Sequence, residues 1–267
     1  MKLHGKTFVV TGTGGGIGGE LALGLLARGA RVAGVDLKPE GMQAVKDRAE
    51  KNGEHMSLHS INIADRTAVE QLPAKALEAH GQIDGIINCA GIVQPFVKVN
   101  ELDFDAIERV MNVNFYGILN MTKVFLPHLL KRDEAYIANV SSMGGFLPVP
   151  GQSVYGASKA AVKLLTEGLY AELLDTNVHV SIVFPGATET NIMKNSGVAM
   201  PSVSSEQTKK YKMLPASEAA RSILDGIEAN RPQIFTGGDS KFMNKLYRLN
   251  PVYATKFIAK QMKSLLK

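Results

Sequence analysis

The chain has 267 residues, of which 45% are hydrophobic and 21% charged, so it can build a substantial core and is not expected to be disordered. Its net charge is +5, but residues 240–267 carry seven Lys or Arg and no acid, so the rest has a net charge of −2. The positive charge therefore belongs to the C-terminal segment, which argues against nucleic-acid binding as the main function. A single cysteine, Cys89, and the absence of a signal-peptide pattern or of an apolar run of about 18 residues favour a cytoplasmic protein.

Short apolar runs alternate with longer helical patterns along the chain. The expected strands are Thr7–Thr11, Arg31–Val35, Met56–Ile61, Gly85–Asn88, Tyr136–Val140 and Val178–Phe184. The expected helices are Ile17–Arg28, Met42–Lys51, Ala68–His80, Phe104–Lys131 and Ser153–Leu174. Near-continuous apolar strands separated by helices predict an α/β protein: a single-domain, doubly wound Rossmann fold whose parallel sheet of about seven strands has helices on both faces.

Three parts of unequal size are expected. Residues 1–240 form the dinucleotide-binding and catalytic domain, and within it residues 190–213, which lack regular periodicity, follow the last strand of the pattern and suit a mobile substrate lid. Residues 241–267 read as a basic, amphipathic helical tail that Pro251 divides into two helices. Such a tail can lie on an anionic membrane surface, or it can pack on its own domain or on a partner subunit.

A glycine-rich loop joins the first expected strand to the first expected helix. Its residues Gly12, Gly14, Gly16, Ile17 and Gly18 allow a tight turn, a close approach of the backbone to a ligand and close packing of the helix on the sheet. The N–H groups at the start of the helix, together with the helix dipole, favour phosphate. The loop therefore predicts a pyrophosphate site.

An acidic residue, Asp36, ends the second expected strand. A carboxylate at this point can accept hydrogen bonds from an adenosine ribose and would repel a 2′-phosphate, so NAD is expected in preference to NADP. Lys38, two residues further on, would weaken that preference.

Tyr155 and Lys159 are the expected proton-transfer pair. Their spacing of four residues puts them on one face of a helix. A free phenol has a pKa of about 10, and a neighbouring ammonium is expected to lower the pKa of Tyr155. Ser142 follows the fifth expected strand, thirteen residues before Tyr155, where its hydroxyl can orient a substrate oxygen.

Further polar and small residues follow other strands or interrupt a helix. Asn88 is expected to pin the backbone at the end of the fourth strand, while Ala90 and Gly91 leave room for a cofactor. Asn114 falls in the middle of a helical pattern, where asparagine is unfavourable, so a local irregularity of the helix or a bound water is expected there.

Taken together, these motifs resemble the short-chain dehydrogenase/reductase family over roughly residues 5–190. The motifs that carry the resemblance, in chain order, are Gly12-x-x-x-Gly16-Ile-Gly18, Asn88-x-Ala-Gly91, Asn114, Ser142 and Tyr155-x-x-x-Lys159. The resemblance implies that Tyr155 exchanges the proton, Lys159 binds nicotinamide ribose hydroxyls, Ser142 holds the substrate oxygen and Asn114 holds a water that relays protons through Lys159. Its implied cofactor contacts at the adenine and nicotinamide ends are Asn62, Ile63, Pro185, Gly186, Thr188 and Thr190.

The implied reaction is hydride transfer between NAD(H) and an alcohol or carbonyl carbon. The residues expected near the substrate are mostly apolar, which suits a hydrophobic alcohol or ketone: Phe96, Gly144, Phe146, Leu147, Pro148, Val149, Met193 and Met200. No metal-ligand cluster is apparent, so a metal is not expected. An NADPH-dependent carbonyl reductase and a dinucleotide-sensing protein without turnover remain alternatives. The family resemblance implies a homodimer or other homo-oligomer, although residues 233–240 depart from the ending typical of its tetramers.

Overall fold

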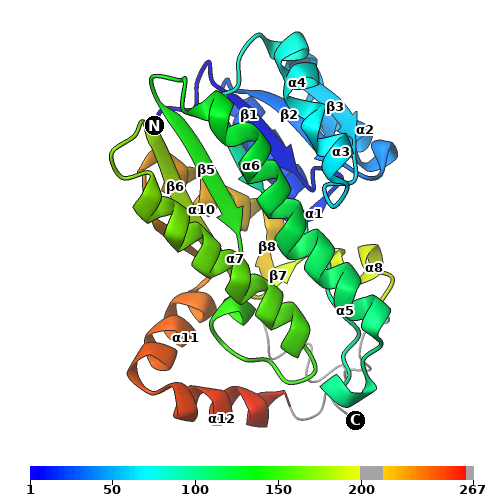
Figure 1. Cartoon of the computed structure of the whole chain (residues 1–267), viewed down its shortest axis with the longest axis vertical. Coiled ribbons are helices and arrows are strands. Elements are labelled where there is room, and N and C mark those ends of the chain that lie inside the picture. Colours follow the sequence, from blue (N-terminus) through cyan, green and yellow to red (C-terminus); the bar gives the residue numbers. More distant parts are fainter. Residues whose placement is uncertain (199–212, 263–267) are drawn as a thin grey trace.

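The computed structural model describes residues 1–198 and 213–262, and it is built around one parallel sheet of seven strands (Figure 1). The strand order is β3-β2-β1-β4-β5-β6-β9. The chain adds β2 and β3 on one side of β1 and then adds β4 and the later strands on its other side, so the strand order reverses between β1 and β4. The bounds are β1 Thr7–Thr11, β2 Arg31–Asp36, β3 Met56–Ser60, β4 Gly85–Asn88, β5 Ala135–Val140, β6 Val178–Pro185 and β9 Gln233–Thr236. A separate pair, β7 (Thr188–Glu189) and β8 (Leu214–Pro215), lies beside it.

Burial on both faces explains the composition of the central strands. β1, β4 and β5 are buried at every position, as expected for Val- and Ile-rich strands of a parallel sheet covered on both sides. One face packs on α1 (Gly16–Ala27), α2 (Pro39–Arg48) and α10 (Ala216–Glu228). The other face packs on α3 (Arg66–Glu70), α4 (Leu72–His80), α6 (Gly117–Leu129) and α7 (Ser153–Glu172). The expected doubly wound α/β fold is therefore confirmed.

Three of the expected helices are wrong in extent. The expected helix 68–80 is two helices, because Asp65 caps α3 and Pro73 starts α4 anew. The expected helix 42–51 begins earlier, at Pro39, and gives way to a 3₁₀ segment at Glu50–His55. The expected helix 104–131 consists of α5 (Phe104–Met111), a π-helical turn at Asn112–Tyr116 and α6.

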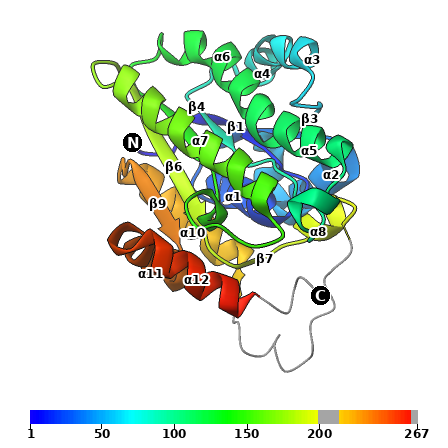
Figure 2. The ribbon, with the colours of Figure 1, turned by 60° about the horizontal axis from the view of Figure 1, so that its bottom comes forward.

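The two C-terminal helices, α11 (Gly238–Leu249) and α12 (Pro251–Gln261), form a layer next to β9 and α10 (Figure 2). The break at Pro251 agrees with the prediction. Their buried residues Met243, Ala254 and Ile258 pack against Leu147, in the loop after β5. The expected boundary between residues 240 and 241 falls in the first turn of α11, so part of the tail packs on its own domain. Most of the expected lid, including Met200, lies outside the described residues.

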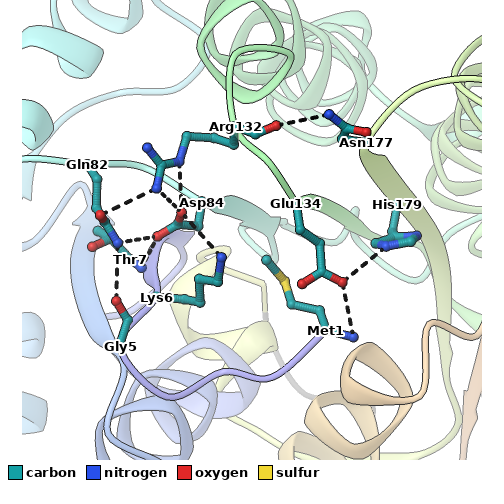
Figure 3. A network of polar contacts seen from close by, with 10 residues as sticks. All are labelled: Met1, Gly5, Lys6, Thr7, Gln82, Asp84, Arg132, Glu134, Asn177 and His179. Atoms are coloured by element: carbon teal, nitrogen blue, oxygen red, sulfur yellow. Dashed lines mark hydrogen bonds and ion pairs between the residues drawn. The ribbon is translucent and has the colours of Figure 1, made fainter.

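The amino-terminal edge of the sheet is held by a buried carboxylate (Figure 3). Asp84 accepts hydrogen bonds from the backbone N–H of Thr7 at 2.8 Å, from Gln82 at 2.8 Å and from Arg132 at 2.9 Å, and Lys6 lies 3.9 Å away. This edge is opposite the one where the predicted site residues lie, so the network serves the fold. Among the described residues, no helix is long and apolar enough to cross a membrane.

Candidate active site

A cleft of about 500 Å³ opens at the carboxyl ends of β1 and β4, where the strand order reverses. Ligands of doubly wound sheets bind at such switch points. The residues predicted for the site that line the cleft are Gly12, Gly14, Gly16, Ile17, Gly18, Asp36, Asn62, Ile63, Ala90, Gly91, Ser142, Tyr155, Lys159, Pro185, Gly186, Thr188 and Thr190. Segments from the whole length of the Rossmann domain thus meet in one cavity.

The glycine-rich loop lines one wall of the cleft. Gly12 and Gly16 have φ values of 78° and 55°, a region that side chains rarely adopt. A Cβ at Gly18 would collide with the carbonyl of Gly12, so glycine is needed for α1 to pack this close to the loop. The N-cap of α1 is Gly15, and no side chain caps the helix. The uncapped N–H groups and the bare backbone fit a pyrophosphate.

Asp36 is fixed by two backbone N–H groups at the end of β2. Its Oδ2 accepts from Gly14 at 2.9 Å and its Oδ1 accepts from Lys38 at 3.2 Å. A Cβ at Gly14 would come within 2.9 Å of this carboxylate. The remaining lone pairs of a carboxylate held in this way can accept ribose hydroxyls.

Asn62 and Ile63 follow β3 at the same end of the cleft. Asn62 Oδ1 accepts from the N–H of Ala64 at 3.0 Å, which forms a local turn. Ile63 is buried against Gly117, where a Cβ would come within 2.7 Å of its side chain. An apolar side chain held in this position can form part of a wall for an adenine ring.

Ser142, Tyr155 and Lys159 lie together at the other end of the cleft. Ser142 follows β5, and its Oγ accepts from the N–H of Gly144 at 3.0 Å, so the hydroxyl proton is free to point elsewhere. Lys159 is buried, and its Nζ donates to the carbonyl of Val140 at 3.0 Å. α7 carries both Tyr155 and Lys159, as their spacing predicts.

The pKa of Tyr155 differs from the expectation. Burial raises this pKa above its usual value of 10.0, and the hydrogen bond with Ser142 opposes the increase. Burial also lowers the pKa of Lys159 to about 8. The sequence predicted a lower pKa for the phenol, and this prediction is wrong for the structure: the causes of the shift are burial and the hydrogen bond with Ser142.

Asn114 lies behind the cleft, within the π-helical turn at Asn112–Tyr116. The turn is the helix irregularity that the unfavourable asparagine predicted. The buried amide accepts from Ile92 N at 2.9 Å, and it donates to Ile92 O at 2.9 Å and to Ser158 Oγ at 3.0 Å. A Cβ at Gly91 would lie 3.1 Å from Lys159 Nζ and 3.2 Å from Asn114 Oδ1, so both polar atoms adjoin Gly91.

Asn88 does not line the cleft and does not pin the backbone after β4. It donates instead to Asn139 Oδ1 at 2.8 Å, within the sheet. The backbone is pinned by Thr11, whose Oγ1 accepts from both Cys89 N and Ala90 N at 3.0 Å. The sequence prediction missed Thr11 because β1 is far from Cys89 in the chain.

The turn after β6 is held from the C-terminal helices. Asp239, in the first turn of α11, accepts from Ala187 N at 2.8 Å, and a Cβ at Gly186 would collide with its carboxylate. Thr188 Oγ1 donates to Gly186 O at 3.0 Å. This wall of the cleft therefore depends on Asp239, which the sequence prediction did not include.

The expected substrate residues separate into two groups. Gly144 lies against the Tyr155 ring, because a Cβ there would be 3.4 Å from its Cε1. Phe146 does not line the cleft, and it packs edge-on against Phe184 at 5.4 Å between ring centroids. Met193 is half-buried and does not line the cleft either. Lys38 also lines the cleft, and the lining residues that the sequence prediction missed include Cys89, Ile92, Asn191, Ile192 and Asn195.

Cys89 also lines the cleft, next to Lys159. Burial raises the pKa of its thiol to about 12, against the opposing effect of Lys159. A thiol with this pKa is not a nucleophile at neutral pH.

The comparisons with known proteins agree with this geometry. Residues 6–200 match the short chain dehydrogenase family. The putative oxidoreductase SadH of Mycobacterium tuberculosis is 34% identical over 257 residues, covering 93% of this chain and 92% of SadH. A short-chain dehydrogenase/reductase from Burkholderia phymatum in complex with NAD superposes with a TM-score of 0.82 and 25% identity, covering 93% of this chain and 96% of that one.

A short chain dehydrogenase from Burkholderia cenocepacia in complex with NADP superposes with a TM-score of 0.81 and 26% identity, covering 97% of this chain and 99% of that one. The fold, the cleft and these matches lead to one assignment. The chain belongs to the short-chain dehydrogenase family, and it is an oxidoreductase of this NAD(P)-dependent class.

Proposed function

We propose that the protein transfers a hydride between NAD(H) and the CH–OH or carbonyl carbon of a hydrophobic alcohol or ketone, with Tyr155 as the general acid/base. One observation carries the proposal: Tyr155, Ser142 and Lys159 lie at one end of a cleft that has Asp36 towards its other end. When bound, the nicotinamide would supply the hydride chemistry at its C4 position, and the protein would supply orientation and control of the proton.

Ser142 and Tyr155 have different proposed roles at the substrate oxygen: Ser142 donates a hydrogen bond and Tyr155 transfers the proton. Because Ser142 Oγ accepts from Gly144 N, its proton is available to a substrate oxygen or to the Tyr155 oxygen. In oxidation, the phenolate form of Tyr155 takes the hydroxyl proton of the alcohol, and in reduction the phenol form gives its proton to the carbonyl oxygen. The hydrogen bond with Ser142 supports this role, because it lowers the pKa of the phenol against the effect of burial.

Lys159 is proposed to bind the nicotinamide ribose, and Asn114 is proposed to hold, together with Lys159, a water that relays protons. Among the described residues, the buried Lys159 ammonium donates to one backbone carbonyl, which leaves donors for nicotinamide ribose hydroxyls. Asn114 Oδ1 and Lys159 Nζ both adjoin Gly91, which supports a water between them that would carry protons onward.

NAD is proposed in preference to NADP because Asp36 would repel a 2′-phosphate. Asp36 is held by two N–H groups, so the carboxylate cannot easily swing away. Lys38 is exposed and lines the same wall, which keeps the NADPH-dependent carbonyl reductase as the alternative. The KM values for NAD and NADP, measured with one alcohol, decide between them, and a clear preference for NADP would contradict the reading of Asp36.

A screen of secondary alcohols and ketones with both coenzymes, followed by absorbance of reduced nicotinamide, tests the proposed activity. Turnover of hydrophobic substrates is expected, since Ile92 and Ile192 form apolar parts of the cleft wall. Absence of turnover across the panel, with NAD bound, would favour the dinucleotide-sensing protein instead.

A homodimer or other homo-oligomer is proposed from the exposed apolar residues of neighbouring helices. Phe104 on α5 is 79% exposed and Leu164 on α7 is 70% exposed, while Tyr116 is half-exposed between α5 and α6. Sedimentation of the parent and of Leu164→Glu tests this proposal. A parent that sediments as a monomer would contradict it.

A peripheral contact with anionic membranes is proposed for the outer face of α11 and α12. Exposed apolar residues there, with Leu249 84% exposed, accompany five Lys or Arg and no acid between residues 240 and 262. Because the inner face packs on Leu147, point substitutions are a cleaner test than a deletion. Leu249→Ser with Val252→Ser should reduce sedimentation with phosphatidylserine vesicles, and unchanged sedimentation would reject the contact. A cytoplasmic location is proposed together with it, supported by the presence of a single cysteine, Cys89.

A further inference from the structure

The segment 91–95, which follows β4, binds two of the proposed catalytic elements. Ile92 uses both its N–H and its carbonyl to bind the Asn114 amide at 2.9 Å. Two residues later, Gln94 reaches the start of α7, the helix that carries Tyr155. A short stretch of backbone therefore ties Asn114 and the Tyr155 helix to the same wall of the cleft.

Gln94 uses both ends of its side-chain amide, and it is fully buried. Its Oε1 accepts a hydrogen bond from the backbone N–H of Tyr155 at 2.8 Å, and its Nε2 donates to the carbonyl of Gly151 at 3.1 Å. A backbone N–H can only donate and a carbonyl can only accept, so the orientation of the amide is fixed by its partners. Gln152 Nε2 donates in return to Gln94 O at 2.9 Å.

The N–H of Tyr155 belongs to the first turn of α7, where backbone donors have no partner within the helix. The N-cap residue, Gln152, makes no side-chain capping bond. Gln94 supplies the missing acceptor from 61 residues away in the chain. Without it, the turn that carries the Tyr155 side chain would be free to fray.

We propose that Gln94 is a positioning residue for Tyr155, which fixes the first turn of α7 so that the phenol oxygen stays beside Ser142. The inference extends the proposed function, and it rests on it only for the effect on turnover. Gln94 is not among the described residues that line the cleft, so it acts through the Tyr155 backbone and not through substrate or cofactor. Small displacements of a reacting group suffice to reduce turnover, since about 1 Å can cost about 100-fold in rate.

Three variants separate positioning from general stability. Gln94→Met keeps the length of the side chain but removes both hydrogen bonds. Gln94→Glu keeps an acceptor oxygen for the Tyr155 N–H. The matched control is Gln82→Met, which removes a half-buried glutamine that donates to Gly5 O at 3.1 Å and to Asp84, at the opposite edge of the sheet (Figure 3).

With NAD and 2-octanol as probes, Gln94→Met is expected to lower kcat about tenfold while the KM for NAD changes by less than about twofold. Gln94→Glu should recover most of the loss, and Gln82→Met should keep the parent's kcat. Equal kcat values in the parent and in a folded Gln94→Met would overturn the proposal. So would equal losses of kcat in the Met and Glu variants.

Hydrogen exchange of the Tyr155 amide, followed by NMR, tests the contact without any turnover. In the parent this amide should be protected like those in the middle of α7, and Gln94→Met should remove the protection while Gln94→Glu retains it. A Tyr155 amide that exchanges freely in the parent would overturn the proposal even if Gln94→Met does not fold. A silent activity screen with a protected amide would instead count against the proposed function alone.

Discussion

A buried charged side chain has different kinds of partner at the two edges of the sheet. At the amino-terminal edge, Asp84 is surrounded by donors, including the cationic Arg132 and Lys6. At the carboxyl-terminal edge, Lys159 is equally buried, yet the partner that the described residues give its Nζ is the neutral carbonyl of Val140. The first arrangement stabilises the fold, whereas the second lowers the pKa of the ammonium and leaves donors for a ligand.

The largest expected effect is a loss of kcat when the proposed acid/base group at the carboxyl-terminal edge is removed and the amino-terminal edge is left unchanged. Tyr155→Phe should reduce kcat about 1000-fold, because general acid/base catalysis contributes roughly 100- to 10,000-fold. The free energy of unfolding should change little, since the ring is retained. Steady-state kinetics together with urea unfolding measure both quantities, and a variant that turns over at the parent's rate would remove Tyr155 from the mechanism.

Asp84→Ala should remove the polar network at the amino-terminal edge and leave the cleft at the carboxyl-terminal edge unchanged. The substitution removes the acceptor of the buried Thr7 N–H and the ion pair with the partly exposed Arg132, so the free energy of unfolding should fall by about 2 kcal/mol. The kcat of the folded enzyme should remain that of the parent. A loss of kcat without a loss of stability would contradict the separation between the two edges.

Lys159→Met should lose activity and gain stability. Burial lowers the pKa of Lys159 from 10.5 to about 8, so folding carries a cost of about 3 kcal/mol at neutral pH. This cost is fully present below pH 8 and disappears as the pH rises past 10.5. The variant should therefore unfold at a higher urea concentration than the parent at pH 7, and the difference should shrink by pH 10. A difference that grows with pH would have the wrong sign.

The smallest expected effect concerns the coenzyme. Asp36→Asn should raise the KM for NAD about tenfold, or about 1.4 kcal/mol, because the neutral amide is a weaker acceptor for ribose hydroxyls. The KM for NADP should fall or stay constant, since the repulsion is removed. Parallel increases in both KM values would mean that Asp36 acts through the Gly14 loop and not on the ribose.

The parts of the fold that depend on local patterns could be predicted from the sequence. The bounds of β1 and β4 follow from short apolar runs, and the cleft residues from Gly12 to Asp36 follow from one strand–turn–helix unit. Pro251 also separates two helices as expected, since proline cannot continue a helix.

The contacts that hold the site in shape could not be predicted, because they join distant parts of the chain. Thr11 pins Cys89, and Gln94 caps the helix of Tyr155, across 78 and 61 residues. Hydrophobicity alone also misplaced Phe146, since an aromatic residue beside a catalytic loop can face the core as well as the cleft. The pKa of Tyr155 was expected to fall for a related reason: the sequence gives the neighbouring charge but not the burial.

The bond between Asp239 and Ala187 has a practical consequence for anyone who wants to shorten the enzyme. A chain cut after β9 would keep every strand of the large sheet but lose the carboxylate that shapes the turn after β6. Such a fragment would keep Asp36, which is proposed to bind the adenosine half of a coenzyme, but the turn that is proposed to hold the nicotinamide half would lose its support. The smallest working unit therefore extends into α11.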